Sequence, residues 1–279
     1  MSYKTILVHL DTSVRAHPRL ESALALARRF DAYVIGLFAV FEPPPRVFTV
    51  MAGTADYYAQ HAALRREQRA AIERLFHAEL TRAGVSGEWI TSDERATVCV
   101  PHYARCVDLV VASQDDPNDP DSYVGDHFPE TLVMSAGRPV LLIPYTGFFA
   151  TIGTHAMVAW DGSREATRAV HDALPLLKAA ERVTVATIDT ASDHAQEERI
   201  HGADIAACIA RHGVSVEVSS NKAPSNAQAG EMLLSRAADI GADLVVMGGY
   251  GHARWQELVL GGATRTFLAS MTVPVLMSH

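Results

Sequence analysis

The chain carries the same sequence pattern twice, and this duplication restricts the folds that it can adopt. Residues 8–13 (VHLDTS) recur as residues 158–163 (VAWDGS), 150 positions further on. A later pair, residues 107–111 and 242–246, is separated by only 135 positions. The first copy therefore holds about 15 additional residues between its second and fourth expected strands. Such a repetition predicts two consecutive units of one fold.

The size and charge of the chain agree with two such units, which we expect at residues 1–147 and 148–279, each within the usual domain size of about 100–200 residues. Each unit has a net charge of −4 and no basic stripe, which argues against nucleic acid as a partner. Three cysteines are too few for a disulfide framework and suit a reducing compartment. The apolar runs are far shorter than the ~20 residues of a membrane span, and no signal peptide is recognisable. We therefore expect a cytoplasmic protein without membrane contact.

Short apolar runs alternate with amphipathic segments in both copies, which is typical of strands and helices that alternate along a chain. The expected strands are 5–10, 33–40, a segment around Trp89, 108–112 and 139–143, then 157–160, 183–188, 214–218, 244–247 and 274–277. The expected helices are 20–30, 59–83 and one containing Cys99 and Cys106, then 165–179, 197–211, 230–240 and 264–270. Continuous apolar strands indicate parallel sheets covered on both faces. The pattern predicts an α/β fold with two tandem, doubly wound, five-stranded sheets that pack together within the chain.

A glycine-rich loop follows the fourth strand of the second copy. Gly248 and Gly251 are followed, after nine further residues, by Gly261. Single glycines are common turn residues, but a glycine loop between a strand and a helix can present backbone amides and the helix N-terminus to a phosphate. Asp161 follows the first strand of the same copy and should face the same crevice. Its carboxylate could accept hydrogen bonds from a ribose or hold a water of Mg²⁺.

This spacing, together with the aspartate and a last strand of x-Pro-Val-Leu form, resembles the universal stress protein family over essentially the whole chain. The resemblance implies a Rossmann-like, five-stranded parallel sheet of order 3-2-1-4-5 in each unit, and binding of ATP or AMP in some members. By position, the implied nucleotide contacts are Asp161 for the ribose, Ala159, Ile188 and Met247 for the adenine, and Gly248, Gly251 and Gly261 for the phosphates.

One position departs from the family pattern. Nucleotide-binding members usually place Ser or Thr after the last glycine, and here that residue is Gly262. A hydroxyl donor that contributes about 0.5–1.5 kcal/mol is therefore missing, although Thr264, Arg254 or Arg265 could compensate. ATP, AMP, another nucleotide and no nucleotide all remain open at this point.

The first copy has lost the glycines while keeping the loop length. The positions that correspond to Gly248, Gly251, Gly261 and Gly262 are Ser113, Asp116, Asp126 and His127. The same segment also gained the carboxylates of Asp115, Asp119 and Asp121, which repel a polyanion. We expect this unit not to bind ATP phosphates. Its acidic loop is either a solvated turn or a site for a divalent cation.

Other kinds of site find less support in the sequence. Cys99, His102 and Cys106 share one helical face and could reach a metal, but the matching residues of the second copy are typical of a packing face. No Gly-x-Ser-x-Gly elbow is present for nucleophilic catalysis. Residues 42–57 are either a lid or a disordered connection.

The functional hypothesis is a stress-response protein that binds an adenine nucleotide in its second unit. The alternatives are a slow ATPase and an interaction module with a vestigial crevice. The paired units could imitate the dimer of single-unit family members, or the chain could form a further homodimer.

Overall fold

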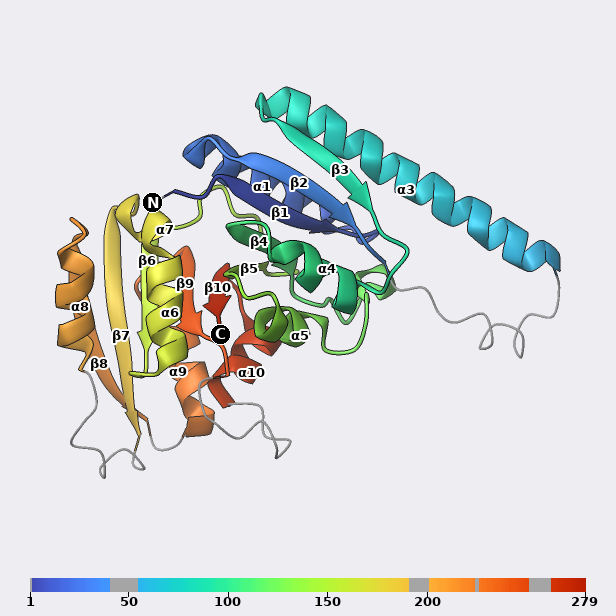
Figure 1. Ribbon diagram of the computed structural model, residues 1–279. Coiled ribbons are helices and arrows are strands. Elements are labelled where there is room, and N and C mark those ends of the chain that lie inside the picture. Colours follow the sequence, from blue (N-terminus) through green and yellow to red (C-terminus); the bar gives the residue numbers. More distant parts are fainter. Residues whose placement is uncertain (1, 41–54, 191–200, 224–225, 251–261) are drawn as a thin grey trace.

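Ten strands form one continuous sheet in the order β3-β2-β1-β4-β5-β10-β9-β6-β7-β8 (Figure 1). The computed structural model describes residues 2–40, 55–190, 201–223, 226–250 and 262–279. The strands are β1 Thr5–Leu10, β2 Tyr33–Phe38, β3 Gly87–Thr91, β4 Leu109–Ser113, β5 Val140–Ile143, β6 His155–Trp160, β7 Arg182–Thr190, β8 Val216–Ala223, β9 Leu244–Gly248 and β10 Val275–Ser278. Both halves have the expected order 3-2-1-4-5, which confirms the predicted fold class.

The two five-stranded sheets join through their last strands. Neighbouring strands are parallel within each unit, whereas β5 and β10 pair antiparallel. Leu141 lies opposite Leu276, the residue 135 positions further on, so equivalent residues face each other. This pairing relates the units by an approximate two-fold axis. The expected packing of the units is therefore confirmed, and its form is a single sheet instead of two.

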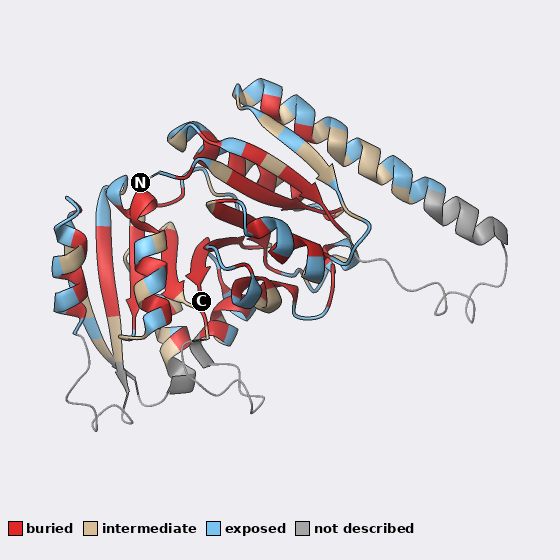
Figure 2. Cartoon of the chain, in the orientation of Figure 1, coloured by how far each residue is buried: buried red, intermediate tan, exposed pale blue. Residues whose placement is uncertain are grey.

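Helices cover both faces of the sheet. They are α1 Ala16–Phe30, α3 Ala55–Ala83, α4 Ala96–Ala104, α5 Phe128–Ser135, α6 Arg164–Asp172, α7 Leu174–Lys178, α8 Gly202–Ala210, α9 Asn226–Asp239 and α10 Gly262–Ser270, with a 3₁₀ turn at Pro120–Ser122. One apolar layer contains residues of α1, α3, α6, α7 and α8, and the other contains residues of α4, α5, α9 and α10. Figure 2 shows the buried strands between helices whose outer faces are exposed. The continuous apolar strands thus have the two-sided burial that a parallel sheet requires.

Most element ends differ from the sequence expectation by a few residues, and three helices differ in kind. Helix α5 was not expected, because it is short and begins at the dipeptide Phe128-Pro129. The expected helix 165–179 is divided into α6 and α7 next to Pro175, whose missing amide suits the first turn of a helix. Helix α4 ends at Ala104, so Cys106 lies beyond it. Most of the segment 42–57 lies outside the described residues.

A repeated aspartate fixes the start of the first strand in each unit. The Asp108 carboxylate accepts hydrogen bonds from the backbone amides of Lys4 and Thr5 at 2.7 and 3.0 Å. Its counterpart Asp243 accepts four hydrogen bonds, from Thr151 Oγ1 and from the amides of Gly153, Thr154 and His155. These bonds align the first and fourth strands of each unit, so that their carboxyl ends reach the same edge of the sheet.

Among the described residues, no helix combines the length and hydropathy that crossing a membrane would require.

Because the strands that join the units are buried, a substitution there should lower the free energy of unfolding as much as one in a domain core. Leu276 is fully buried, so Leu276→Ala should lower the free energy of unfolding by about 2–5 kcal/mol, as measured by urea denaturation. The control Val218→Ala, at the exposed edge strand β8, should change it by less than about 1 kcal/mol. Equal losses for the two variants would contradict a shared core at the β5–β10 junction.

Candidate functional site

Asp161 lies directly after β6, where the parallel strands of the second unit end. The residue is exposed, and its Oδ1 accepts a hydrogen bond from the Ser163 amide at 2.9 Å. Ser163 in turn caps α6, because its Oγ accepts from the Ala166 amide at 3.1 Å. The turn therefore fixes the carboxylate at the edge of the sheet. Among the described residues, none forms an ion pair with Asp161.

The three residues expected beside the adenine belong to one face of the sheet. Ala159 on β6 lies opposite Met247 on β9, and both are buried. Ile188 on β7 contributes to the same apolar layer and is partly exposed. The structure thus places the expected adenine contacts on adjacent strands, with Ala159 two residues before Asp161.

Gly248 ends β9 at a point where the chain comes very close to α6. A Cβ atom at this position would lie 2.5 Å from the backbone nitrogen of Ala166. Glycine is therefore required by packing between strand and helix, whatever else the loop does. This contact brings the glycine loop next to the turn that carries Asp161.

The remaining loop residues are only partly described. Gly251, Gly261 and Arg254 lie outside the described residues. Gly262 is the first residue of α10, so the helix begins where the expected phosphate loop ends. Thr264 is buried, and its Oγ1 accepts a hydrogen bond from the Tyr250 amide at 3.4 Å, while Arg265 is exposed. The Thr264 hydroxyl thus connects α10 to the beginning of the loop.

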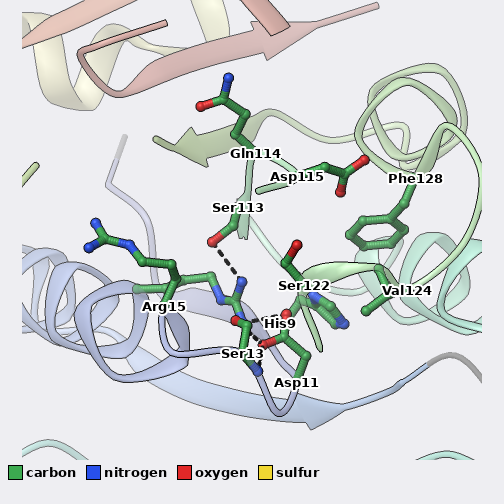
Figure 3. Close-up of a pocket in the computed structure, with 11 residues that line it drawn as sticks. His9, Asp11, Ser13, Arg15, Ser113, Gln114, Asp115, Ser122, Val124 and Phe128 are labelled. Carbon is green, nitrogen blue, oxygen red and sulfur yellow. Dashed lines mark hydrogen bonds and ion pairs between the residues drawn. The ribbon is translucent and has the colours of Figure 1, made fainter. Parts of the chain in front are cut away.

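In the first unit, an internal ion pair occupies the corresponding crevice (Figure 3). Asp11, the counterpart of Asp161, contacts Arg19 Nη2 through Oδ2 at 2.9 Å, and their side chains are 3% and 1% exposed. The Ser13 hydroxyl and amide donate to Asp11 Oδ1 at 2.5 and 3.0 Å. Arg19 Nη1 donates to Ser113 Oγ at 2.6 Å. Burial alone would raise the pKa of Asp11, but Arg19, His9 and Ser13 together hold that pKa below its ordinary value.

His9 closes the same crevice on the face where the second unit has Ala159. Its Nε2 donates to the Ala39 carbonyl at 2.8 Å, and its ring lies 4.9 Å from that of Phe128, measured between centroids. Burial and the nearby Arg19 charge lower the pKa of His9 to about 4, against opposing effects of Asp11 and the carbonyl. The imidazole is therefore neutral at physiological pH.

The acidic loop of the first unit uses several of its carboxylates to hold its own backbone. Asp119 accepts from the amides of Val14 and Asp121, and Asp116 accepts from the amide of Asn118. Asp115 lines the remaining pocket, where burial, followed by the Glu130 and Asp11 charges, raises its pKa to about 6. These contacts favour the interpretation of the loop as a structural turn.

The structure gives no support to a metal site. Within the described ranges, no group of three or more His, Cys, Asp or Glu side chains could hold a metal ion. Cys99 is buried, whereas His102 and Cys106 are exposed, so the three do not converge as expected from a shared helical face.

Sequence reasoning missed Arg19 and His9, although the duplication contains the signal for both. At the offset of 150 they correspond to Ala169 and Ala159, so two large polar side chains stand where the second unit has alanine. Ser113, which binds Arg19, likewise replaces Gly248. In the first unit, the three larger side chains fill the space beside Asp11.

Comparison with known proteins agrees with this architecture. Residues 154–279 match the model of the universal stress protein family. A universal stress protein from Archaeoglobus fulgidus DSM 4304 is similar in structure, with a TM-score of 0.70 and 15% sequence identity, over 98% of this chain and 95% of that one. A protein of unknown function from Pseudomonas aeruginosa PAO1 has a TM-score of 0.63 and 15% identity, over 99% of this chain and 92% of that one. Among curated proteins, no sequence matches this chain. The second unit thus matches the universal stress protein family, and the whole chain shares the fold of these two structures.

The contrast between the two aspartates predicts opposite effects of the same substitution. Asp11→Asn leaves Arg19 buried without its anionic partner and should lower the free energy of unfolding by about 3–5 kcal/mol. Asp161→Asn, at an exposed residue, should change it by less than about 1 kcal/mol. Urea denaturation of both variants measures this difference, and comparable losses would contradict the distinction between a structural and an available carboxylate.

The buried His9 predicts a specific acid sensitivity. Because its folded pKa of about 4 lies below the unfolded value of 6.5, the unfolded chain binds the proton first as the pH falls. Stability should therefore decrease between pH 6.5 and 4, by about 3 kcal/mol in total from this group. Thermal unfolding of His9→Ala should show a weaker pH dependence across this range than the unsubstituted protein. The control His212→Ala, at an exposed residue, should leave the dependence unchanged.

Proposed function

We propose that the second unit binds an adenine nucleotide, ATP or AMP, at the carboxyl ends of β6 and β9, and that the chain acts in stress response through this binding. The observation that carries the proposal is the difference between the two crevices. Asp11 is buried and paired with Arg19, whereas Asp161 is exposed and has no cationic partner among the described residues. At the end of the first strand, the second unit thus keeps a carboxylate that can accept hydrogen bonds from a ligand, whereas the carboxylate of the first unit is engaged within the chain.

The described residues suit the parts of such a nucleotide. The Asp161 carboxylate can accept from the ribose hydroxyls, and Mg²⁺, when present, could be held through a water at the same group. Ala159 is small and lies beside Met247 and near Ile188, which provides an apolar surface for a base. The N-terminus of α10 can stabilise phosphate charge through its free amides. The missing hydroxyl at Gly262 makes AMP as reasonable a ligand as ATP.

Binding without rapid turnover is the form of this function that the side chains favour. Near Asp161, the buried Glu165 carboxylate forms an ion pair with Arg164. Its Oε1 is thus engaged by a cation, which makes this carboxylate a weaker base for activating a water. The first unit, with its crevice closed, would serve as a structural partner.

The proposal predicts one nucleotide per chain, bound only in the second unit. Isothermal titration with Mg·ATP and with AMP should give saturable binding, and Asp161→Asn should weaken it about 10–100-fold, as expected for loss of a charge-assisted hydrogen bond. Gly251→Asp, which introduces the residue found at the corresponding position of the first unit, should abolish binding.

Two controls make this test specific. The reverse exchange, Asp116→Gly in the first unit, should leave affinity and stoichiometry unchanged. Phosphate release measured on the same samples detects turnover. Absence of binding by the unsubstituted protein, or full binding by Gly251→Asp, would contradict the proposed site, and many turnovers per chain would favour an ATPase.

A further inference from the structure

The glycine loop of the second unit begins against a side chain of the first unit. Gly249 directly follows β9, and a Cβ atom at this position would lie 2.6 Å from Val133 Cγ1 on α5. This separation is far below the 3.5–4.0 Å at which carbon atoms pack. Val133 itself is buried, so it has little freedom to move away. Gly249 is thus required because α5 of the other unit occupies the space.

Hydrogen bonds of the Gly249 amide and carbonyl hold its backbone in place next to Val133. Its amide donates to the Ser278 carbonyl at 2.9 Å, and its carbonyl lies 3.0 Å from His279 Nδ1. The Ser278 hydroxyl is in turn bonded to Asp172 Oδ2 at 2.9 Å. The first residue of the loop is therefore fixed by β10 on one side and by α5 on the other.

Tyr250 fixes the direction in which the chain continues. It has a φ of 60°, a left-handed conformation that is uncommon outside glycine. Its ring packs in the apolar layer that also contains Val133, and its hydroxyl is buried without a hydrogen-bond partner. Burial, followed by the charge of Glu130 on α5, raises the pKa of this hydroxyl. The Tyr250 side chain thus lies in the apolar layer to which α5 contributes, within reach of the Glu130 charge.

A second contact from the first unit reaches the helix that follows the loop. Gln114, which corresponds to Gly249, donates through Nε2 to the Leu268 carbonyl of α10 at 2.9 Å. Leu268 corresponds to Val133, so the two contacts are related by the approximate two-fold axis. Residues of the first unit therefore contact the chain both before and after the glycine loop.

We propose that α5 of the first unit positions the phosphate loop of the second, with Val133 as the positioning residue. This proposal rests on the proposed nucleotide binding. The first unit has a closed crevice of its own, yet it determines where the loop of its neighbour begins. A displacement of α5 would shift Gly249 and Tyr250 and thereby change the affinity for a nucleotide that Val133 never touches.

A rescue experiment across the two units tests this role. Gly249→Ala adds a methyl group that collides with Val133, and the affinity for Mg·ATP, measured by isothermal titration, should fall at least tenfold. Val133→Ala in the same chain removes the colliding methyl group and should restore the affinity to within threefold of the unsubstituted protein. Gly248→Ala is the matched control, because its Cβ would meet the Ala166 backbone at 2.5 Å, and Val133→Ala should not rescue it.

The possible outcomes separate the two proposals. If the unsubstituted protein binds neither Mg·ATP nor AMP, the proposed function is wrong and this inference falls with it. If it binds and Gly249→Ala stays within twofold, or if the double variant is not rescued, the positioning role is wrong. A merely structural role predicts that the double variant has both lower thermal stability and lower affinity, whereas positioning predicts recovered affinity despite lower stability. Should Gly249→Ala fail to fold, Val133→Ile is the alternative variant. It enlarges the side chain on α5 that faces Gly249 and should weaken binding at least threefold.

Discussion

The antiparallel pairing of β5 with β10 determines how the rest of the molecule is arranged. Each unit alone would expose the edge of its last strand, and a buried pair at Leu141 and Leu276 removes both edges. Because equivalent residues face each other, the units are related by an approximate two-fold axis, and this relation brings α5 of the first unit against the loop after β9. The contact between Val133 and Gly249 is thus a consequence of strand pairing. Because both units belong to one chain, they remain paired with each other. Their sequences can therefore differ.

The divergence follows from what a carboxylate requires when it is buried. A buried charge is costly unless it is paired and hydrogen-bonded. In the first unit, Arg19 and Ser13 satisfy Asp11 from within the chain, and His9 takes the space that a ligand would need. In the second unit, alanines at the corresponding positions leave Asp161 in contact with solvent. One scaffold thereby yields a unit whose aspartate is paired within the chain and a unit whose aspartate is exposed.

The duplication allowed most of the strands to be predicted, because continuous apolar runs and their spacing repeat in both copies. The order of the strands in the sheet was implied by the resemblance to the universal stress protein family. Helix α5 was missed because its eight residues are too few to show a helical period and begin beside a proline. The joining of the sheets was predicted only as packing, since strand register depends on contacts between distant segments. The candidate site was predicted from Asp161 and the glycine spacing, and it stays a prediction. The role of Arg19 depends on a tertiary ion pair, although its replacement by Ala169 was visible in the sequence. Gly251 and Gly261 lie outside the described residues, so their part in the site stays a prediction.

The central claim is that two crevices of common origin now differ, one closed by its own side chains and one open. Methyl NMR during titration with Mg·ATP tests it most directly, because methyl groups in both crevices can be followed in the same sample. The account predicts shifts at the methyl groups of Ala159, Ile188 and Met247, saturating at one nucleotide per chain, while Val124 in the first pocket does not respond. Shifts confined to Val124, or saturation at two nucleotides per chain, would contradict it.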